Sequence, residues 1–211
     1  MRTLRAYLAL IVVGALLPGT VLTGVLVWRA FSEARAASER RLLESARVDA
    51  AALGREFDGV IHTLSALATS PSLDRDDFQA FHAEARRVQA SQPGWYSIVL
   101  LSAPGEQQLL TTREEWGAPL RPALEPGSLR RLVSTREPTV GGIRPDPRGS
   151  GVLLFPIRVP VVRGGALKFA LSAIIDVQSL ARLVPGRPAE SGEWTRSILD
   201  ADGIIAVRTR G

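Results

Sequence analysis

The spacing of hydrophobic residues changes along this chain, and each change predicts a different kind of element. The first apolar stretch, Ala6–Trp28, contains no charged residue. It is longer than the about 20 residues that a helix needs to cross a bilayer. The alternative is a cleaved signal peptide, whose apolar region is normally shorter, about 7–15 residues, with a small-residue cleavage site directly after it. We therefore expect residues 1–28 to form a short cytoplasmic head and a transmembrane helix.

The next stretch shows a heptad pattern of apolar residues over more than three repeats. The spacing alternates between three and four residues at Leu43, Ala46, Ala50, Leu53, Phe57, Val60, Leu64 and Leu67. This period is typical of a helix that packs along an apolar seam. We expect a long stalk helix over residues 29–70 that continues from the transmembrane helix. The seam fits pairing with the same helix of a second subunit, packing against the downstream domain, or both.

Residues 71–184 show shorter periods, which predict a domain of helices and antiparallel strands. Asp76 is expected to cap a helix that begins at Asp77, and Ser128 a helix that begins at Leu129. The predicted elements are a helix over Asp77–Ser91, strands over Trp95–Leu101 and Gln107–Thr112, a helix over Leu129–Ser134, strands over Gly151–Val162 and Ala166–Ile175, and a short helix over Val177–Val184.

In each of the two long strands, every second residue is apolar and the residues between them are mixed. One face is apolar, with Leu153, Phe155, Ile157, Val159 and Val161 on the first strand and Leu167, Phe169, Leu171, Ala173 and Ile175 on the second. The other face is mixed and carries Arg158, Lys168, Ser172 and Asp176. An apolar face and a mixed face predict an antiparallel sheet that helices cover on one side. The fold class is therefore α+β, with helices flanking the sheet.

The last stretch, residues 185–211, predicts a linker and one more hairpin. Its strands are expected over Trp194–Leu199 and Ile204–Arg208, with the turn Asp200–Gly203 between them. An isolated two-stranded hairpin is only marginally stable in water. We expect these residues to be the start of an incomplete second domain, or a hairpin that packs on the first.

Composition narrows the function. The chain has 211 residues, no cysteine and a net charge of +5, and Lys168 is its one lysine. The arginines are spread along the chain without interleaved aromatic residues, which argues against nucleic-acid binding. Motifs for a metal site, a phosphate-binding loop or a nucleophile are missing, so we expect no catalytic residue, metal or cofactor in these residues.

Three stretches resemble the double Cache family of extracytoplasmic sensor modules, which are similar to PAS domains. They are GREFDGVIHTLSALATSPSL, SQPGWYSIVLLSAPGEQQLL and VLLFPIRVPVVRGGALKFALSAIIDV, all within residues 40–177. The style of these stretches is most similar to the input regions of histidine kinases from arginine-rich proteobacterial genomes. The resemblance implies a PAS-like, membrane-distal sensor domain, with the rest of the proximal domain, a second span and the output domain missing from this sequence.

The resemblance also implies a ligand pocket between the mixed face of the sheet and the loops after the first hairpin. The candidate ligand-binding residues are Trp95, Tyr96, Arg113, Trp116, Arg158 and Asp176. A forked cation, a carboxylate and aromatic walls suit an amino acid or a small carboxylate. For Asp176 the alternative is to cap the helix that begins at Val177.

The sequence thus suggests an input region in the bacterial inner membrane that binds a small ligand and relays its presence across the membrane. We expect a cytoplasmic N-terminus, a periplasmic sensor domain and a homodimer through the long helix. The resemblance implies a histidine kinase as the parent protein. The alternatives are the input region of a chemoreceptor or a diguanylate cyclase, and an envelope-anchored binding or structural protein without output.

Overall fold

In a computed structural model of the chain, the structure describes residues 28–29, 31–32, 35, 40–41, 43–103, 107–182, 196–200 and 202–209. The chain divides into two compact units, Met1–Ala50 and Ala51–Gly211. Within the described residues, no helix is both long enough and apolar enough to cross a membrane. The transmembrane prediction over Ala6–Trp28 lies outside them except for Trp28.

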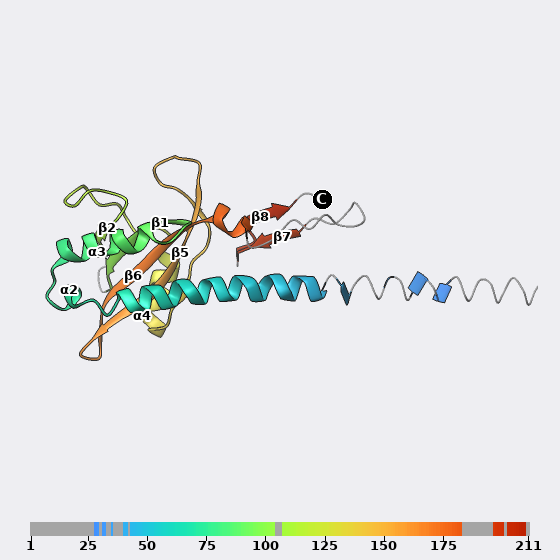
Figure 1. Cartoon of the computed structure of the whole chain (residues 1–211), viewed down its shortest axis with the longest axis horizontal. Helices are drawn as coiled ribbons and strands as arrows, with labels where there is room; N and C mark the ends of the chain where they lie inside the picture. The colour runs from blue at the N-terminus through green and yellow to red at the C-terminus, as the bar shows by residue number, and fades with distance from the viewer. Residues whose placement is uncertain are drawn as a thin grey trace, which may run out of the picture. The chain divides into compact units, whose positions relative to one another are not determined.

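A six-stranded antiparallel sheet forms the centre of the second unit, in the order β2-β1-β6-β5-β3, with β4 also paired to β5 (Figure 1). The strands are β1 (Trp95–Ser102), β2 (Gln108–Thr111), β3 (Thr139–Val140), β4 (Arg144–Pro145), β5 (Leu153–Arg163) and β6 (Ala166–Asp176). The four longer strands lie within two residues of their predicted bounds, which confirms the antiparallel α+β fold. The two-residue strands β3 and β4 were not predicted.

One face of the sheet is covered by the helical residues 51–67 and by α3 (Phe78–Ala90). Val60, Leu64 and Leu67 are buried there, and the Phe57 ring lies 5.8 Å from the Phe155 ring. The seam of the stalk helix therefore packs against its own sheet from Leu53 onward. Residues 43–50, in the first unit, are also helical.

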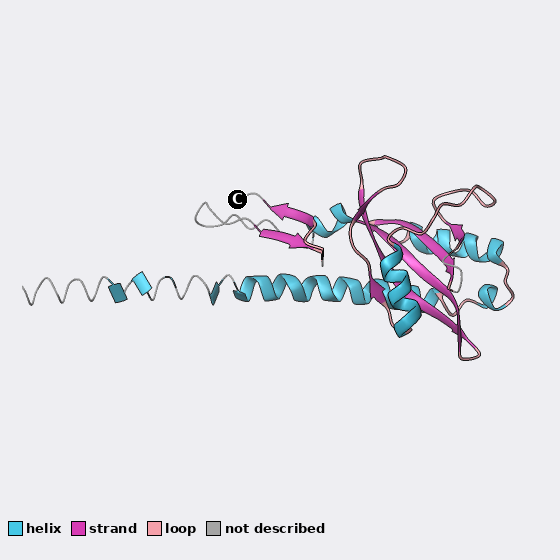
Figure 2. Cartoon of the chain, turned by 180° about the vertical axis from the view of Figure 1, so that it is seen from behind, coloured by secondary structure: helices cyan, strands magenta, loops and turns pink. Residues whose placement is uncertain are grey.

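The opposite face of the sheet is covered as well, by α4 (Pro126–Thr135) and the loop before it. Figure 2, seen from behind, shows α4 in front of the strands. Leu129 and Leu132 of this helix pack there in a second apolar cluster that includes Leu154. The prediction of a sheet covered on one side was therefore wrong, because Arg158 and Ser172 made this buried face look half polar in the sequence.

A β-bulge changes the predicted side of one residue. The partner of β5 shifts from Phe169 at Val161 to Leu167 at Val162, so Lys168 is an extra residue in β6. An extra residue inverts the alternation of side chains beyond it. Leu167 consequently packs with the second cluster, not beside Phe169 as predicted.

Two predicted helix caps were wrong by local chemistry. Asp77, not Asp76, caps α3: its Oδ1 accepts a hydrogen bond from the Ala80 amide at 3.0 Å. The helix α4 starts earlier than predicted because Pro126 suits the first helical position, and the Glu125 carboxylate accepts from the Ser128 amide at 2.9 Å. A one-turn helix, α2 (Pro71–Asp74), was not predicted.

The chain continues through a 3₁₀ helix, η1 (Val177–Arg182), to the hairpin of β7 (Arg196–Leu199) and β8 (Ile205–Thr209). Among the strands that the structure describes, these two pair with each other and not with the main sheet, which confirms the predicted hairpin. The Ala206 side chain packs against the first apolar cluster. The hairpin is thus attached to the sheet domain, which supplies the stability that a lone hairpin lacks.

A close approach at Gly141 yields a test of this packing. A Cβ at Gly141 would lie 2.6 Å from Pro156 Cγ and 2.7 Å from Ser128 Oγ, too close to be accommodated without a shift. We expect Gly141→Ala to lower the free energy of unfolding by about 1–3 kcal/mol, measured by urea denaturation. The matched control is Gly54→Ala, in a helix with nothing within 4 Å of the new Cβ. This variant should gain about 0.5–1 kcal/mol, and equal effects of the two substitutions would contradict the packing described.

Candidate ligand-binding site

A cavity lies between the α4 face of the sheet and two loops, one after β2 and one after β4. The cavity has a volume of about 60 Å³, several times the roughly 10–15 Å³ that one water needs. The lining includes apolar strand residues and six chemically distinctive side chains: Tyr96, Glu114, Arg121, Asp146, Arg148 and Arg158. The cavity therefore combines apolar walls with charges of both signs.

A tight turn after β4 places an acid and a base at the cavity. The Gly149 amide donates to the Asp146 carbonyl at 2.9 Å, and Pro147 and Gly149 stand where such turns favour proline and glycine. Gly149 has a φ of +76°, which glycine adopts without strain. The turn thereby holds the Asp146 carboxylate and the Arg148 guanidinium two residues apart, and both line the cavity.

The Asp146 side chain is only 5% exposed and is held by neutral donors. Its Oδ2 accepts from the Tyr96 hydroxyl at 2.8 Å and from Ser150 Oγ at 2.6 Å. Its Oδ1 accepts from the Arg148 amide at 3.2 Å. Burial alone would raise the pKa of Asp146, but these hydrogen bonds and the Arg148 charge outweigh it and lower the pKa. Asp146 is therefore a fixed negative charge at neutral pH.

Tyr96 is itself fixed from two sides. Gln89 Nε2 of α3 donates to the Tyr96 carbonyl at 2.9 Å. The Arg113 Cζ lies 4.3 Å from the centre of the Tyr96 ring, within the range of a cation–π contact. Arg113 thus contacts a wall of the cavity without being part of its lining.

The two loops meet through an ion pair between Arg148 and Glu114. The backbone of the Glu114 loop is tied to α3 by His82, which is 5% exposed. His82 Nε2 lies 3.1 Å from the carbonyl oxygens of both Thr111 and Glu114, so it carries the proton and donates to them. The loop after β2 is therefore anchored by its backbone, while the Glu114 side chain reaches the cavity.

Arg158 on β5 is 1% exposed and forms the floor of the cavity. Its Nε and one terminal nitrogen donate to Ser128 Oγ and Ser172 Oγ, each at 2.8 Å. Its other terminal nitrogen donates to the carbonyl oxygens of Leu124 and Glu125. Burial lowers the pKa of Arg158 to about 10, with a partial offset from the Glu125 charge. Arg158 stays cationic at neutral pH, and the four acceptors of these hydrogen bonds are uncharged oxygen atoms.

The structure separates the residues predicted for the site. Tyr96 and Arg158 line the cavity, and Arg113 contacts it through Tyr96. Three others lie elsewhere. Trp95 is buried on the opposite face of the sheet, and Trp116 is 45% exposed beside His82. Asp176 lies at the start of η1, where its Oδ1 accepts a hydrogen bond from the Gln178 amide at 2.9 Å.

Sequence reasoning missed Glu114, Asp146 and Arg148. The Asp-Pro-Arg-Gly turn was a usable signal, because it holds two opposite charges in a defined geometry beside a short strand. Within the part of the chain that the structure describes, no group of three or more metal-ligating side chains is found.

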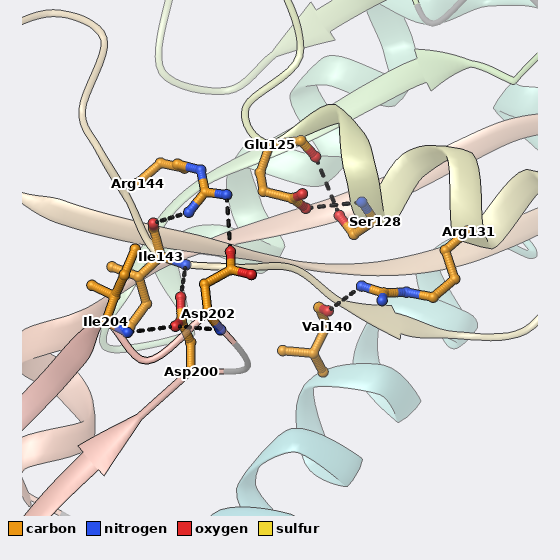
Figure 3. Close-up of polar contacts among 9 residues, drawn as sticks. All are labelled: Glu125, Ser128, Arg131, Val140, Ile143, Arg144, Asp200, Asp202 and Ile204. Atoms are coloured by element: carbon orange, nitrogen blue, oxygen red, sulfur yellow. Dashed lines mark hydrogen bonds and ion pairs between the residues drawn. The ribbon is translucent and has the colours of Figure 1, made fainter.

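The hairpin of β7 and β8 contacts the segment that leads to Asp146 (Figure 3). The Asp200 Oδ2 accepts from the Ile143 amide at 2.9 Å, and its Oδ1 accepts from the amides of Asp202 and Ile204. Arg144 pairs with Asp202 at 3.2 Å. Partial burial alone would raise the pKa of Asp200. The backbone hydrogen bonds and the Arg144 charge outweigh burial, so the pKa of Asp200 is lowered. β4 is thus fixed to the hairpin two residues before the carboxylate of the cavity.

The fold is similar to that of several solved sensor domains. It resembles the ligand-binding domain of the amino acid chemoreceptor PctB of Pseudomonas aeruginosa PAO1 in complex with L-Arg, with a TM-score of 0.60 and 16% identity over 79% of this chain and 68% of that one. It also resembles the ligand-binding domain of the chemoreceptor CtaA of Pseudomonas fluorescens in complex with L-serine. The TM-score is 0.63 and the identity is 16%, over 82% of this chain and 73% of that one.

The ligand-binding domain of PctC of Pseudomonas aeruginosa PAO1 with GABA is also similar, with a TM-score of 0.55 and 15% identity over 81% of this chain and 74% of that one. This chain spans about two thirds to three quarters of these domains. No family model and no curated protein matches the sequence. The sheet domain nevertheless has the fold of Cache-type, PAS-like sensor domains, as the resemblance in the sequence implied.

Arg158 provides a test of how the cavity floor is held. We expect Arg158→Met to lower the free energy of unfolding by about 3 kcal/mol or more, because buried hydroxyl and carbonyl groups lose their donor. Chemical denaturation measures the change. The control is Arg131→Met in α4, which removes an exposed guanidinium with one hydrogen bond, to the Val140 carbonyl at 3.2 Å. That variant should change stability by about 0.5 kcal/mol or less. A loss at Arg158 no larger than this would contradict the role described for it.

Proposed function

We propose that this chain is the signal-input region of a bacterial membrane receptor and that its cavity binds a small molecule with a cationic amine and a carboxylate. The observation that supports this most directly is the turn that presents Asp146 and Arg148 to one cavity. A buried carboxylate suits an ammonium group, and a guanidinium suits a carboxylate through paired hydrogen bonds. The apolar strand residues of the lining enclose the rest of the ligand.

The structural neighbours support the same ligand class. PctB, CtaA and PctC are solved with L-Arg, L-serine and GABA, and each of these molecules carries an amine and a carboxylate. The fold is shared, whereas the sequence identity is only 15–16%. The proposed ligand chemistry therefore follows from the charges of this cavity, and the neighbours support it.

The receptor that we propose is anchored in the inner membrane by Ala6–Trp28, with a cytoplasmic N-terminus and a periplasmic sensor domain. By the resemblance of its sequence, the output is that of a histidine kinase. A chemoreceptor is the second candidate, and the similarity to chemoreceptor domains favours it. Sequencing the gene beyond codon 211 would separate the two, and a stop codon there without an adjacent output gene would favour a binding protein without output.

Ligand binding is tested by the thermal shift of the full chain against L-amino acids, GABA and dicarboxylates. We expect at least one compound to raise the melting temperature, and Asp146→Asn to weaken its binding by about tenfold or more, because the ammonium loses its charged partner. The control is Asp58→Asn, the same change on an exposed helical residue outside the cavity. A shift that is equally large in Asp146→Asn would rule out this cavity as the ligand site.

The proposed dimer can be tested with cysteines, since the chain has none of its own. Leu43 belongs to the heptad seam and is 60% exposed, and Val48 lies off the seam at 62% exposure. If two subunits pair along the seam, Leu43→Cys forms a disulfide-linked dimer on mild oxidation, while Val48→Cys gives little. Non-reducing electrophoresis of the membrane-inserted chain measures both, and equal yields would count against pairing along the seam.

A further inference from the structure

The ion pair between Arg148 and Glu114 joins two loops that are 34 residues apart in the sequence. Both side chains line the cavity. Arg148 is 23% exposed and Glu114 is 37% exposed. The Glu114 carboxylate is therefore already bound to the Arg148 guanidinium inside the proposed ligand site.

The other arginines near the cavity have different partners. Arg158 donates to uncharged oxygen atoms, and Arg113 stacks on the Tyr96 ring. Among the arginines that line the cavity in the described part of the chain, Arg148 is the one whose guanidinium is hydrogen-bonded to a carboxylate. Its position therefore shows that a carboxylate fits at this place in the lining.

We propose that Glu114 is an internal competitor, which the carboxylate of the ligand displaces from Arg148. Glu114 thereby sets the affinity of the cavity for carboxylate ligands, and Arg148 is the residue that recognises this group. This inference rests on the proposed function, because it assumes that the cavity takes a ligand. It adds the identity of the carboxylate-binding residue and a residue that opposes binding.

The exchange is physically reasonable because similar contacts are broken and formed. One charge-assisted pair replaces another, and the displaced Glu114 side chain is exposed enough to be hydrated. The loop need not move, since the Glu114 carbonyl stays within hydrogen-bond distance of His82. Pairs of this exposure are weak, so competition from Glu114 lowers the affinity by about fivefold at most. While Glu114 is paired with Arg148, the carboxylate of the ligand cannot bind this guanidinium. The apparent affinity for the ligand is therefore reduced in proportion to the fraction of molecules in which Arg148 is free.

The experiment compares Glu114→Gln with Glu115→Gln, which removes the same charge one residue away. Glu115 is 86% exposed and pairs with Arg86 outside the cavity. The probes are L-serine, L-arginine and L-glutamine, each with its α-carboxamide, titrated calorimetrically into the full chain. We expect Glu114→Gln to bind at least one of the three acids about twofold to fivefold more tightly than wild type does. Glu115→Gln should match wild type, and the α-carboxamides should gain nothing.

The remaining outcomes separate a failure of the competitor role from a failure of the proposed function. An equal gain for acid and α-carboxamide, or no gain in Glu114→Gln, overturns the competitor role. If wild type binds a probe and Asp146→Asn does not, while Glu114→Gln shows no gain, the proposed function stands and this inference fails. If no probe binds to wild type or to Glu114→Gln, with melting temperatures unchanged, both are overturned.

Discussion

The buried guanidinium of Arg158 is the constraint on which the second face of the sheet depends. A charge that is 1% exposed must have its hydrogen bonds satisfied, and the acceptors come from α4, from β6 and from the loop before α4. One side chain of β5 thus joins the start of α4, with the loop before it, to β6. The same contacts define the floor of the cavity, so fold and site share one set of interactions.

The sheet was predictable because every second residue of its long strands is apolar over many positions. The pairing of β5 with β6 follows from two such strands around a Gly-Gly turn. β3 and β4 were missed because each has two residues and is held by pairing with β5 and by contacts from distant segments, which no local pattern reveals. Leu167 was misplaced because a bulge has no clear signature among apolar residues.

The lining of the cavity could be anticipated from the sequence at some positions only, for physical reasons that its residues illustrate. The pairing of β1 with β6 is irregular between Trp95 and Ser97, so Trp95 packs in the core on the other face of the sheet while Tyr96 lines the cavity. Arg158 was found because a charged residue interrupts an apolar strand. Asp146 and Arg148 escaped notice because loop residues acquire their surroundings from tertiary structure, here from Tyr96, Ser150 and Glu114.

The attachment of the hairpin to β4 has a consequence for where the domain can be cut. Arg144 pairs with Asp202 and is separated from Asp146 only by Pro145, whose ring fixes its φ angle. Asp146, at the acidic end of the cavity, is therefore held in a fixed position relative to the hairpin turn. A shorter protein that stopped before β7 would keep every residue that lines the cavity and still lose a support of the turn that carries Asp146.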